Sequence, residues 1–278
     1  MQPNLALNIP QITSGHSRLR IALIDAFAGF QAVNIWARLG WRDTKRRYRR
    51  TVFGPFWTTL SPAIFVVTLG LIWANLWGHD AKTYLPFLTS GMVCWSLFSA
   101  TCTEGCNGFI VQETLIKQLR ISYTLISCAI VWRNVIVFFH NIIILVLVGI
   151  YCGTPISWAT LLVIPGFLLL CLNLVWIAEL LAAICARYRD ILQLVTNLLQ
   201  ISLFLTPIFW TPDQLKGRMA ILVEFNPIYH LIAIVREPLL GKTPALEHWG
   251  VALVITVLGW ATVAQVMRKF RHRIAYWL

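Results

Sequence analysis

Six stretches of this chain are apolar and long enough to cross a lipid bilayer, which restricts the folds open to it. In hydrocarbon every backbone polar group must be hydrogen-bonded within the protein, so an apolar stretch of about 20 residues crosses as a helix. The sequence therefore predicts an all-α membrane protein with six transmembrane helices. We place these helices at residues 60–77, 85–102, 125–151, 158–186, 191–210 and 249–267.

Most of the positive charge falls on one side of the predicted spans. Arg133 lies near the start of the third span and is counted here with the segment before it. Alternate segments then hold 18 of the 23 lysines and arginines. Cytoplasmic segments retain Lys and Arg during membrane insertion. We therefore expect both termini to be cytoplasmic, which an even number of spans permits.

The composition indicates some partners and excludes others. Only 12% of the residues are charged, whereas soluble domains have about a quarter. The basic residues behind the net charge of +12 flank apolar spans. Membrane lipids with anionic headgroups are therefore an expected partner, and nucleic acid is not. The seven cysteines do not combine with histidines into a zinc-binding pattern, so no metal site is predicted.

The chain is interpreted as a single membrane domain, residues 1–278, in three parts. A cytoplasmic N-terminal segment, 1–50, precedes the six-span bundle, 60–267, and a cytoplasmic tail, 268–278, follows it. The N-terminal segment contains an amphipathic stretch, because polar residues recur along one helical face. These residues are Gln31, Asn34, Arg38, Arg42 and Lys45. The stretch is expected to lie in the inner membrane interface, as a lipid anchor or as a docking element for a cytoplasmic partner.

The inner segment at 104–124 is polar enough to leave the membrane. Glu113, Lys117 and Arg120 fall on one helical side at steps of four and three. This spacing is consistent with a short helix that projects into the cytoplasm, although a solvated loop is the commoner origin of charges at this spacing. The segment is therefore a candidate contact for a cytoplasmic partner.

The outer segment at 211–248 contains two helix-start signals. Thr211-Pro212 and Asn226-Pro227 each place a capping residue before a proline. Proline tolerates the first helical position because its missing N–H would have no partner there. Two short external helices are therefore expected. They would form a gate over a pore, or they would be ordinary connections between spans.

The chain lacks the motifs of several enzyme classes. It has no G-x-x-x-x-G-K-[ST] phosphate loop, so it cannot bind ATP by that route. It has no H-E-x-x-H and no G-x-S-x-G, which disfavours a membrane-embedded enzyme. Glu179 is the clearest acid within a span, and one acid is thin support for coupling to protons or sodium. The many aromatic rings would suit a path for a sugar chain, although most are expected to face lipid or core.

Four motifs, in order, resemble those of the ABC-2 type transporter permeases. Residues 47–57, RYRRTVFGPFW, resemble the entry to the first span in that family. Residues 186–191, ARYRDI, resemble its short inner loop, and residues 206–210, TPIFW, resemble the end of its fifth span. Residues 225–231, FNPIYHL, through 236–241, REPLLG, resemble the outer segment of the branch that exports O-antigen and related surface polysaccharides.

The resemblance implies an exporter half rather than an enzyme. Two copies of this chain would form the pore, and two copies of a separate cytoplasmic ATPase would bind ATP and Mg²⁺ and drive transport. This chain itself would hold no cofactor. The cargo would be a lipid-linked polysaccharide that crosses the bacterial inner membrane. Ala233 and Glu237 depart from the branch, where an acid and a small residue are expected, and this bears on the substrate.

The resemblance also implies roles for particular segments. Residues that couple the chain to the ATPase would be Arg38, Arg42, Glu113, Lys117 and Arg120. Residues of the external gate would be Pro212, Asn226, Pro227, Tyr229 and Arg236. Rings near the substrate path are assigned from their positions along the first, second and fifth spans. They are Phe56, Trp95, Phe98, Phe204 and Phe209.

Other functions stay open from the sequence alone. Within the same family the cargo could be capsule, teichoic acid or a small drug. A secondary transporter or channel would work without any ATPase.

Overall fold

The structure is a computed structural model that describes residues 18–49, 56–78, 80–119, 121–214 and 220–278. All regular secondary structure in these residues is helical, which confirms the predicted all-α class. The first six helices are α1 Arg18–Gln31, α2 Val33–Tyr48, α3 Phe56–Trp77, α4 Ala81–Cys106, α5 Gly108–Val111 and α6 Glu113–Gln118. The others are α7 Tyr123–Cys152, α8 Val163–Arg187, α9 Ile191–Leu205, α10 Ala220–Glu224, α11 Pro227–Leu239 and α12 Leu246–Trp277. Short 3₁₀ turns occur at Trp158–Leu162 and Pro212–Gln214.

Within the described residues, five helices are long and apolar enough to span a membrane. They are Trp57–Leu76, Ala81–Cys106, Tyr123–Cys152, Trp158–Arg187 and Leu246–Trp277. These helices overlap the predicted first, second, third, fourth and sixth spans. The second helix continues to Cys106, four residues past its predicted end, so Glu104 belongs to the helix rather than to a loop.

The predicted fifth span is shorter than expected. It was placed at 191–210, but α9 ends at Leu205 after 15 residues, a length of about 22 Å where a bilayer core is about 30 Å thick. Thr206 leaves the helix in an extended conformation because Pro207 follows it. The indole Nε1 of Trp210 then donates to the carbonyl oxygen of Phe204, 2.9 Å away, which folds the chain back on the helix end. The count of six spans stays a prediction.

Local signals explain where the long helices begin and end. Asp80 caps α4 by accepting from the backbone N–H of Lys82, 3.2 Å away, and Ser122 caps α7 in the same way. Gly153 ends α7 with a φ of +70°, a left-handed conformation that costs glycine little.

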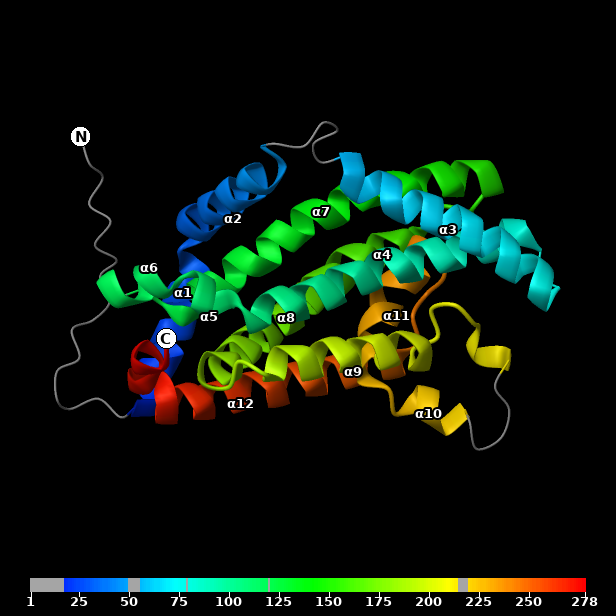
Figure 1. The fold of residues 1–278 in the computed structure, drawn as a ribbon. Helices are drawn as coiled ribbons and strands as arrows, with labels where there is room; N and C mark the ends of the chain where they lie inside the picture. Colours follow the sequence, from blue (N-terminus) through cyan, green and yellow to red (C-terminus); the bar gives the residue numbers. More distant parts are fainter. Residues whose placement is uncertain (1–17, 50–55, 79, 120, 215–219) are drawn as a thin grey trace.

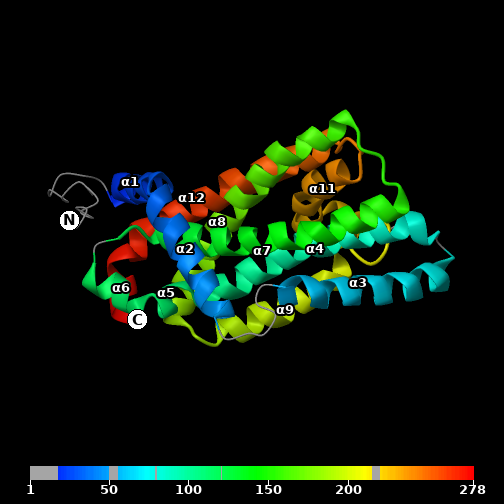
Figure 2. The same cartoon turned by 90° about the horizontal axis from the view of Figure 1, so that it is seen from above.

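The elements gather at two ends of an elongated bundle (Figures 1 and 2). The C-terminal end of α12 lies with α1, α5 and α6 at one end, on the left in both views. The connection between α3 and α4 and the end of α7 lie at the other. We call these the inner end and the outer end, after the charge distribution. The described start and end of the chain therefore share one end, as same-side termini require.

α4 is the centre of the bundle. In the most apolar 18-residue segment of α4, 72% of the residues are buried inside the protein, against 22–33% for the corresponding segments of the other four long helices. It packs against α7, α8, α3, α11 and α9. Small residues allow the closest approaches: Gly105 of α4 faces Ala178 of α8, and Gly166 of α8 faces the backbone of Ile234 in α11.

Candidate functional site

A largely buried carboxylate at the inner end joins the interface helix to the centre of the bundle. Oε2 of Glu104, on α4, accepts from Nε and Nη2 of Arg133, at 3.0 and 2.6 Å, and from Nδ2 of Asn134, at 2.8 Å. Oε1 accepts from Nη2 of Arg47, on α2, at 2.5 Å. Asp43 of α2 lies 3.7 Å from Arg133 and completes the group. We call Asp43, Arg47, Glu104 and Arg133 the inner ion cluster.

The inner ion cluster holds together three helices. Glu104 and Arg133 are each only 17% exposed, so their charges attract each other with little screening by water. α2 also packs on α7 through an edge-to-face contact of Trp36 and Trp132, with ring centroids 5.8 Å apart. A cavity of about 310 Å³ lies beside the cluster and is lined by Asp43, Arg47, Glu104 and Arg133 among others. A displacement of α2 would therefore be transmitted to α4 and α7.

A second tie joins the two ends of the described chain. Asp25 of α1 is buried and accepts from Nη2 of Arg271, on α12, at 2.7 Å. It also accepts from the backbone N–H of Tyr123, at 3.1 Å, and its backbone carbonyl accepts from the hydroxyl of Ser122, at 2.7 Å. The start of α7 and the end of α12 are thereby held against α1.

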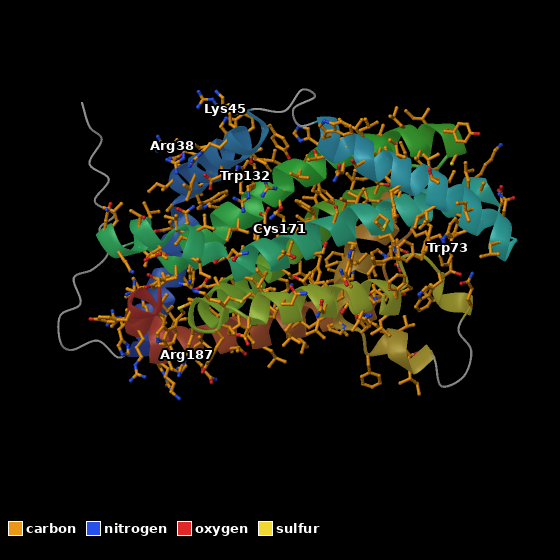
Figure 3. The ribbon with its side chains drawn as sticks, viewed as in Figure 1. Arg38, Lys45, Trp73, Trp132, Cys171 and Arg187 are labelled. Carbon is orange, nitrogen blue, oxygen red and sulfur yellow. The ribbon has the colours of Figure 1, made fainter. Side chains whose placement is uncertain are left out.

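Of the residues predicted for ATPase coupling, the four that the structure describes lie on two helices of the inner end. Arg38 and Arg42 are on the exposed side of α2, and Figure 3 shows Arg38 and Lys45 on the side of that helix away from the bundle. Glu113 and Lys117 form an exposed ion pair on α6, at 2.6 Å. The Lys117 ammonium holds the pKa of Glu113 below its ordinary value. Arg120 lies outside the described residues.

The exposed ion pair of Glu113 and Lys117 on the six-residue helix α6 contributes little to the free energy of folding. We expect the double substitution Glu113→Gln and Arg120→Gln to leave folding intact and to uncouple ATP hydrolysis in the partner from export. Coupled ATPase and export assays on the same preparation would measure this. Unchanged export per ATP hydrolysed would remove these residues from the coupling contact.

At the outer end, Asn226 and Arg236 organise α11. Asn226 caps the helix by accepting from the backbone N–H groups of Ile228 and Tyr229, at 3.0 and 3.3 Å, and Pro227 occupies its first turn. This confirms the helix start predicted from Asn226-Pro227. The amide of Asn226 also donates to Thr206, at 3.0 Å, so the cap is linked to the end of α9.

Arg236 is the most deeply buried charge at the outer end, with 3% of its surface exposed. Its Nη1 donates to the carbonyl oxygen of Pro207, at 2.5 Å, and its guanidinium lies 4.4 Å from the ring centre of Phe87. Burial lowers the pKa of this guanidinium. The hydroxyl of Tyr84 donates to the carbonyl oxygen of Phe209, in the same turn. Side chains of α4 and α11 thus satisfy carbonyl oxygens of the turn that follows α9.

A buried histidine pair joins α11 to α12. Nδ1 of His230 lies 2.7 Å from Nδ1 of His248, and Nε2 of His230 lies 2.7 Å from the carbonyl oxygen of Glu224. The carbonyl oxygen only accepts, so His230 carries a proton on Nε2, and in its neutral form it accepts at Nδ1 from His248. Nε2 of His248 faces a carboxylate oxygen of Glu237, at 3.5 Å.

Loss of this pair should weaken the outer end. We expect His248→Phe to lower the free energy of unfolding by about 1–2 kcal/mol, because His230 then lacks a donor in a buried site. Thermal melting in detergent would measure this against His272→Phe, since His272 is exposed on the same helix. Equal melting temperatures for the two variants would contradict the role of the pair.

Comparison with known proteins agrees with this architecture. The profile of the ABC-2 type transporter family matches residues 35–240, from α2 to the end of α11. This chain belongs to the ABC-2 type transporter family. It is a multi-pass protein of the inner membrane.

Relatives of this ABC-2 permease extend the comparison. The chain is 22% identical over 244 residues to the O-antigen export system permease protein RfbA of Klebsiella pneumoniae. The aligned region covers 84% of this chain and 91% of that protein. The chain is 25% identical over 227 residues to the O-antigen export system permease protein RfbA of Myxococcus xanthus, with 79% and 86% covered. The resemblance inferred from the four motifs is therefore confirmed, although 50–55 of the first motif lie outside the described residues.

The structure distributes the predicted path rings of the ABC-2 permease unevenly. Trp95 and Phe98 are buried in the main core, with ring centroids 5.8 Å apart. Phe204 is 64% exposed on α9 and lies 5.8 Å from the buried Phe209. Phe56 begins α3, and its side chain lies outside the described set. The path assignment stays a prediction for all five rings.

The inner ion cluster is the feature that the sequence-based prediction missed. Arg133 was counted with the inner segment that precedes its span, but it is mostly buried and bound to Glu104. The sequence contained a signal for this cluster, because an arginine inside an apolar span usually pairs with an acidic residue nearby. Glu104 and Asp43 were the acids at the adjoining span end and in the interface helix.

The outer residue Pro212 begins a 3₁₀ turn, Pro212–Gln214, rather than a longer helix in the described part of the chain. Glu179 is buried on α8. The guanidinium of Arg187, at the end of α8, lies over the rings of Tyr188 and Trp277, 5.1 and 5.3 Å from their centres.

Proposed function

We propose that this ABC-2 permease is the transmembrane subunit of an ATP-driven exporter of O-antigen or a related lipid-linked polysaccharide. The observation that carries the proposal is its similarity to two O-antigen export permeases over 86–91% of their lengths. The single membrane domain at 1–278 would form the pore as a homodimer. Its segments would be the interface segment at 1–50, the bundle at 60–267 and the tail at 268–278.

Energy would come from two copies of a separate cytoplasmic ATPase subunit. The chain has no phosphate loop, so the partner would bind ATP and Mg²⁺. Exposed basic residues of α2 and the ion pair of α6 lie at the same end of the bundle, which supports a contact there. ATP-driven closure of the partner would move α2, and the inner ion cluster would pass that movement to α4 and α7.

The outer end would act as the gate. Asn226 at the start of α11 donates to Thr206, and Arg236 joins α11 to Pro207 in the turn that follows α9. Opening would require these contacts to loosen. Pro212, Asn226, Pro227, Tyr229 and Arg236 would thus belong to one movable unit.

The proposal is tested by reconstitution. The permease is co-purified with the ATPase encoded beside it and placed in vesicles with fluorescent lipid-linked glycan. We expect glycan to cross only with the partner and ATP present, and a partner variant without its catalytic residue serves as control. Transport by the permease alone would overturn the proposal.

A further inference from the structure

α9 presents faces of different chemistry along its 15 residues. The face that packs against the core of the bundle contains Val195, Leu199 and Leu203. A neighbouring face is apolar and more than half exposed, and contains Leu194, Leu198 and Ile201. Such a face suits contact with lipid. A helix that only anchored the chain in a membrane would require these two apolar faces and no polar face.

A third face of α9 is polar and uncharged. Gln193, Asn197 and Gln200 are all exposed, at steps of four and three, and the exposed ring of Phe204 follows four residues later. At 100° per residue these four side chains fall within an arc of about 60°. We call the three amides the amide stripe. It lies between the packed face and the exposed leucine face and joins neither.

The amide stripe is poorly matched to lipid. Amide groups have donors and acceptors that hydrocarbon leaves without partners. The one bond within the stripe, from Nε2 of Gln193 to Oδ1 of Asn197 at 3.2 Å, uses one of those donors and one acceptor. Gln200 lies about 14 Å along the helix from its start, well inside the depth of a bilayer. The stripe therefore requires a polar neighbour at membrane depth.

We propose that the amide stripe of α9 is the surface along which the exported glycan slides. This inference rests on the proposed function. Sugar hydroxyls both donate and accept hydrogen bonds, as amides do, so each hydroxyl passing the stripe finds a complementary group. Because the amides are uncharged, each contact is weak, and weak contacts at several points allow a chain to move on.

The surroundings of the stripe favour a sugar chain over a second copy of α9. The stripe leads to the ring of Phe204, which is 64% exposed, and its centroid lies 5.8 Å from that of the buried Phe209. Rings present flat apolar faces that suit the apolar faces of sugars. A helix–helix contact between copies needs no such aromatic end.

Export kinetics test the inference. The variant Gln193→Leu, Asn197→Leu, Gln200→Leu is compared with Leu194→Ala, Leu198→Ala on the neighbouring face, in complexes with the ATPase. We expect at least about tenfold slower glycan export for the first variant, since several hydrogen bonds are lost. The second should export at the wild-type rate. Asn197→Gln with Gln200→Asn, which keeps the amides, should also export.

Photocrosslinking covers the case in which the triple variant does not assemble. A photoreactive phenylalanine analogue placed singly at Asn197 should capture labelled glycan during ATP-driven export, whereas the same probe at Leu194 should not. Crosslinks from position 197 to lipid or to a second copy, without glycan, would overturn the inference, as would wild-type export by the assembled triple variant. If the wild-type complex itself exported nothing, the proposed function would fail instead.

Discussion

Glu104→Gln is expected to lower the free energy of unfolding by about 3 kcal/mol and to abolish export. The substitution leaves Arg47 and Arg133 facing each other with only Asp43 to balance their charges. Removal of one partner from a mostly buried ion group is far more costly than its formation was favourable, because the remaining charge stays desolvated. In a chain of this size the loss corresponds to a fall in Tm of roughly 6–12 °C.

Export should fail for a mechanical reason as well. In the proposed mechanism the conformational change of the ATPase moves α2. Glu104 would pass this movement on, because it binds both Arg47 of α2 and Arg133 of α7. Without it, ATP hydrolysis should continue in the assembled complex while glycan export stops. Melting in detergent, ATPase activity and export are measured on one preparation.

Two controls separate this effect from a general loss of charge. Glu113→Gln removes a carboxylate from an exposed pair and should leave Tm unchanged. Glu104→Gln combined with Arg133→Gln should cost less than the sum of the single variants, because the two groups act as a pair. Strict additivity, or a Tm equal to that of the wild type, would show that the cluster does not hold α2 in place.

Gly166→Ala is expected to cause a large loss of stability from a single added methyl group. A Cβ at this position would overlap the backbone carbonyl oxygen of Ile234 in α11. Backbone cannot rotate away as a side chain can, so α8 and α11 must separate, which costs about 1–3 kcal/mol or more. Because α11 carries Arg236, the substitution should also disturb the turn after α9 and slow export.

Gly250→Ala is the matched control. Gly250 lies in α12, and a Cβ there would have no heavy atom within 4 Å. Alanine is the better helix former by about 1 kcal/mol, so this variant should be as stable as the wild type or more so. Thermal melting of the two variants side by side measures the difference. If the Gly166→Ala variant had the same Tm as the Gly250→Ala variant, α8 and α11 would not approach each other this closely.

Local features of the sequence predicted much of the fold. Apolar length located five of the long helices, and proline with a capping residue located the start of α11 at Asn226-Pro227. The fifth span was overextended because Ile208, Phe209 and Trp210 continue its apolar run. An apolar run indicates that residues are buried or face lipid, but it does not indicate that the backbone stays helical. Here Pro207 ends the helix, because the residue before a proline disfavours the helical conformation.

By itself the sequence determined that this is a helical membrane protein of the ABC-2 family, because period, length and motif order are properties of neighbouring residues. Only the tertiary structure decided which charges meet. Asp25 and Arg271 lie 246 positions apart, and Arg47 and Glu104 lie 57 apart. No local pattern encodes such pairs, since they form only after whole helices have packed. The same packing turned one face of α9 to the core and left its amides exposed.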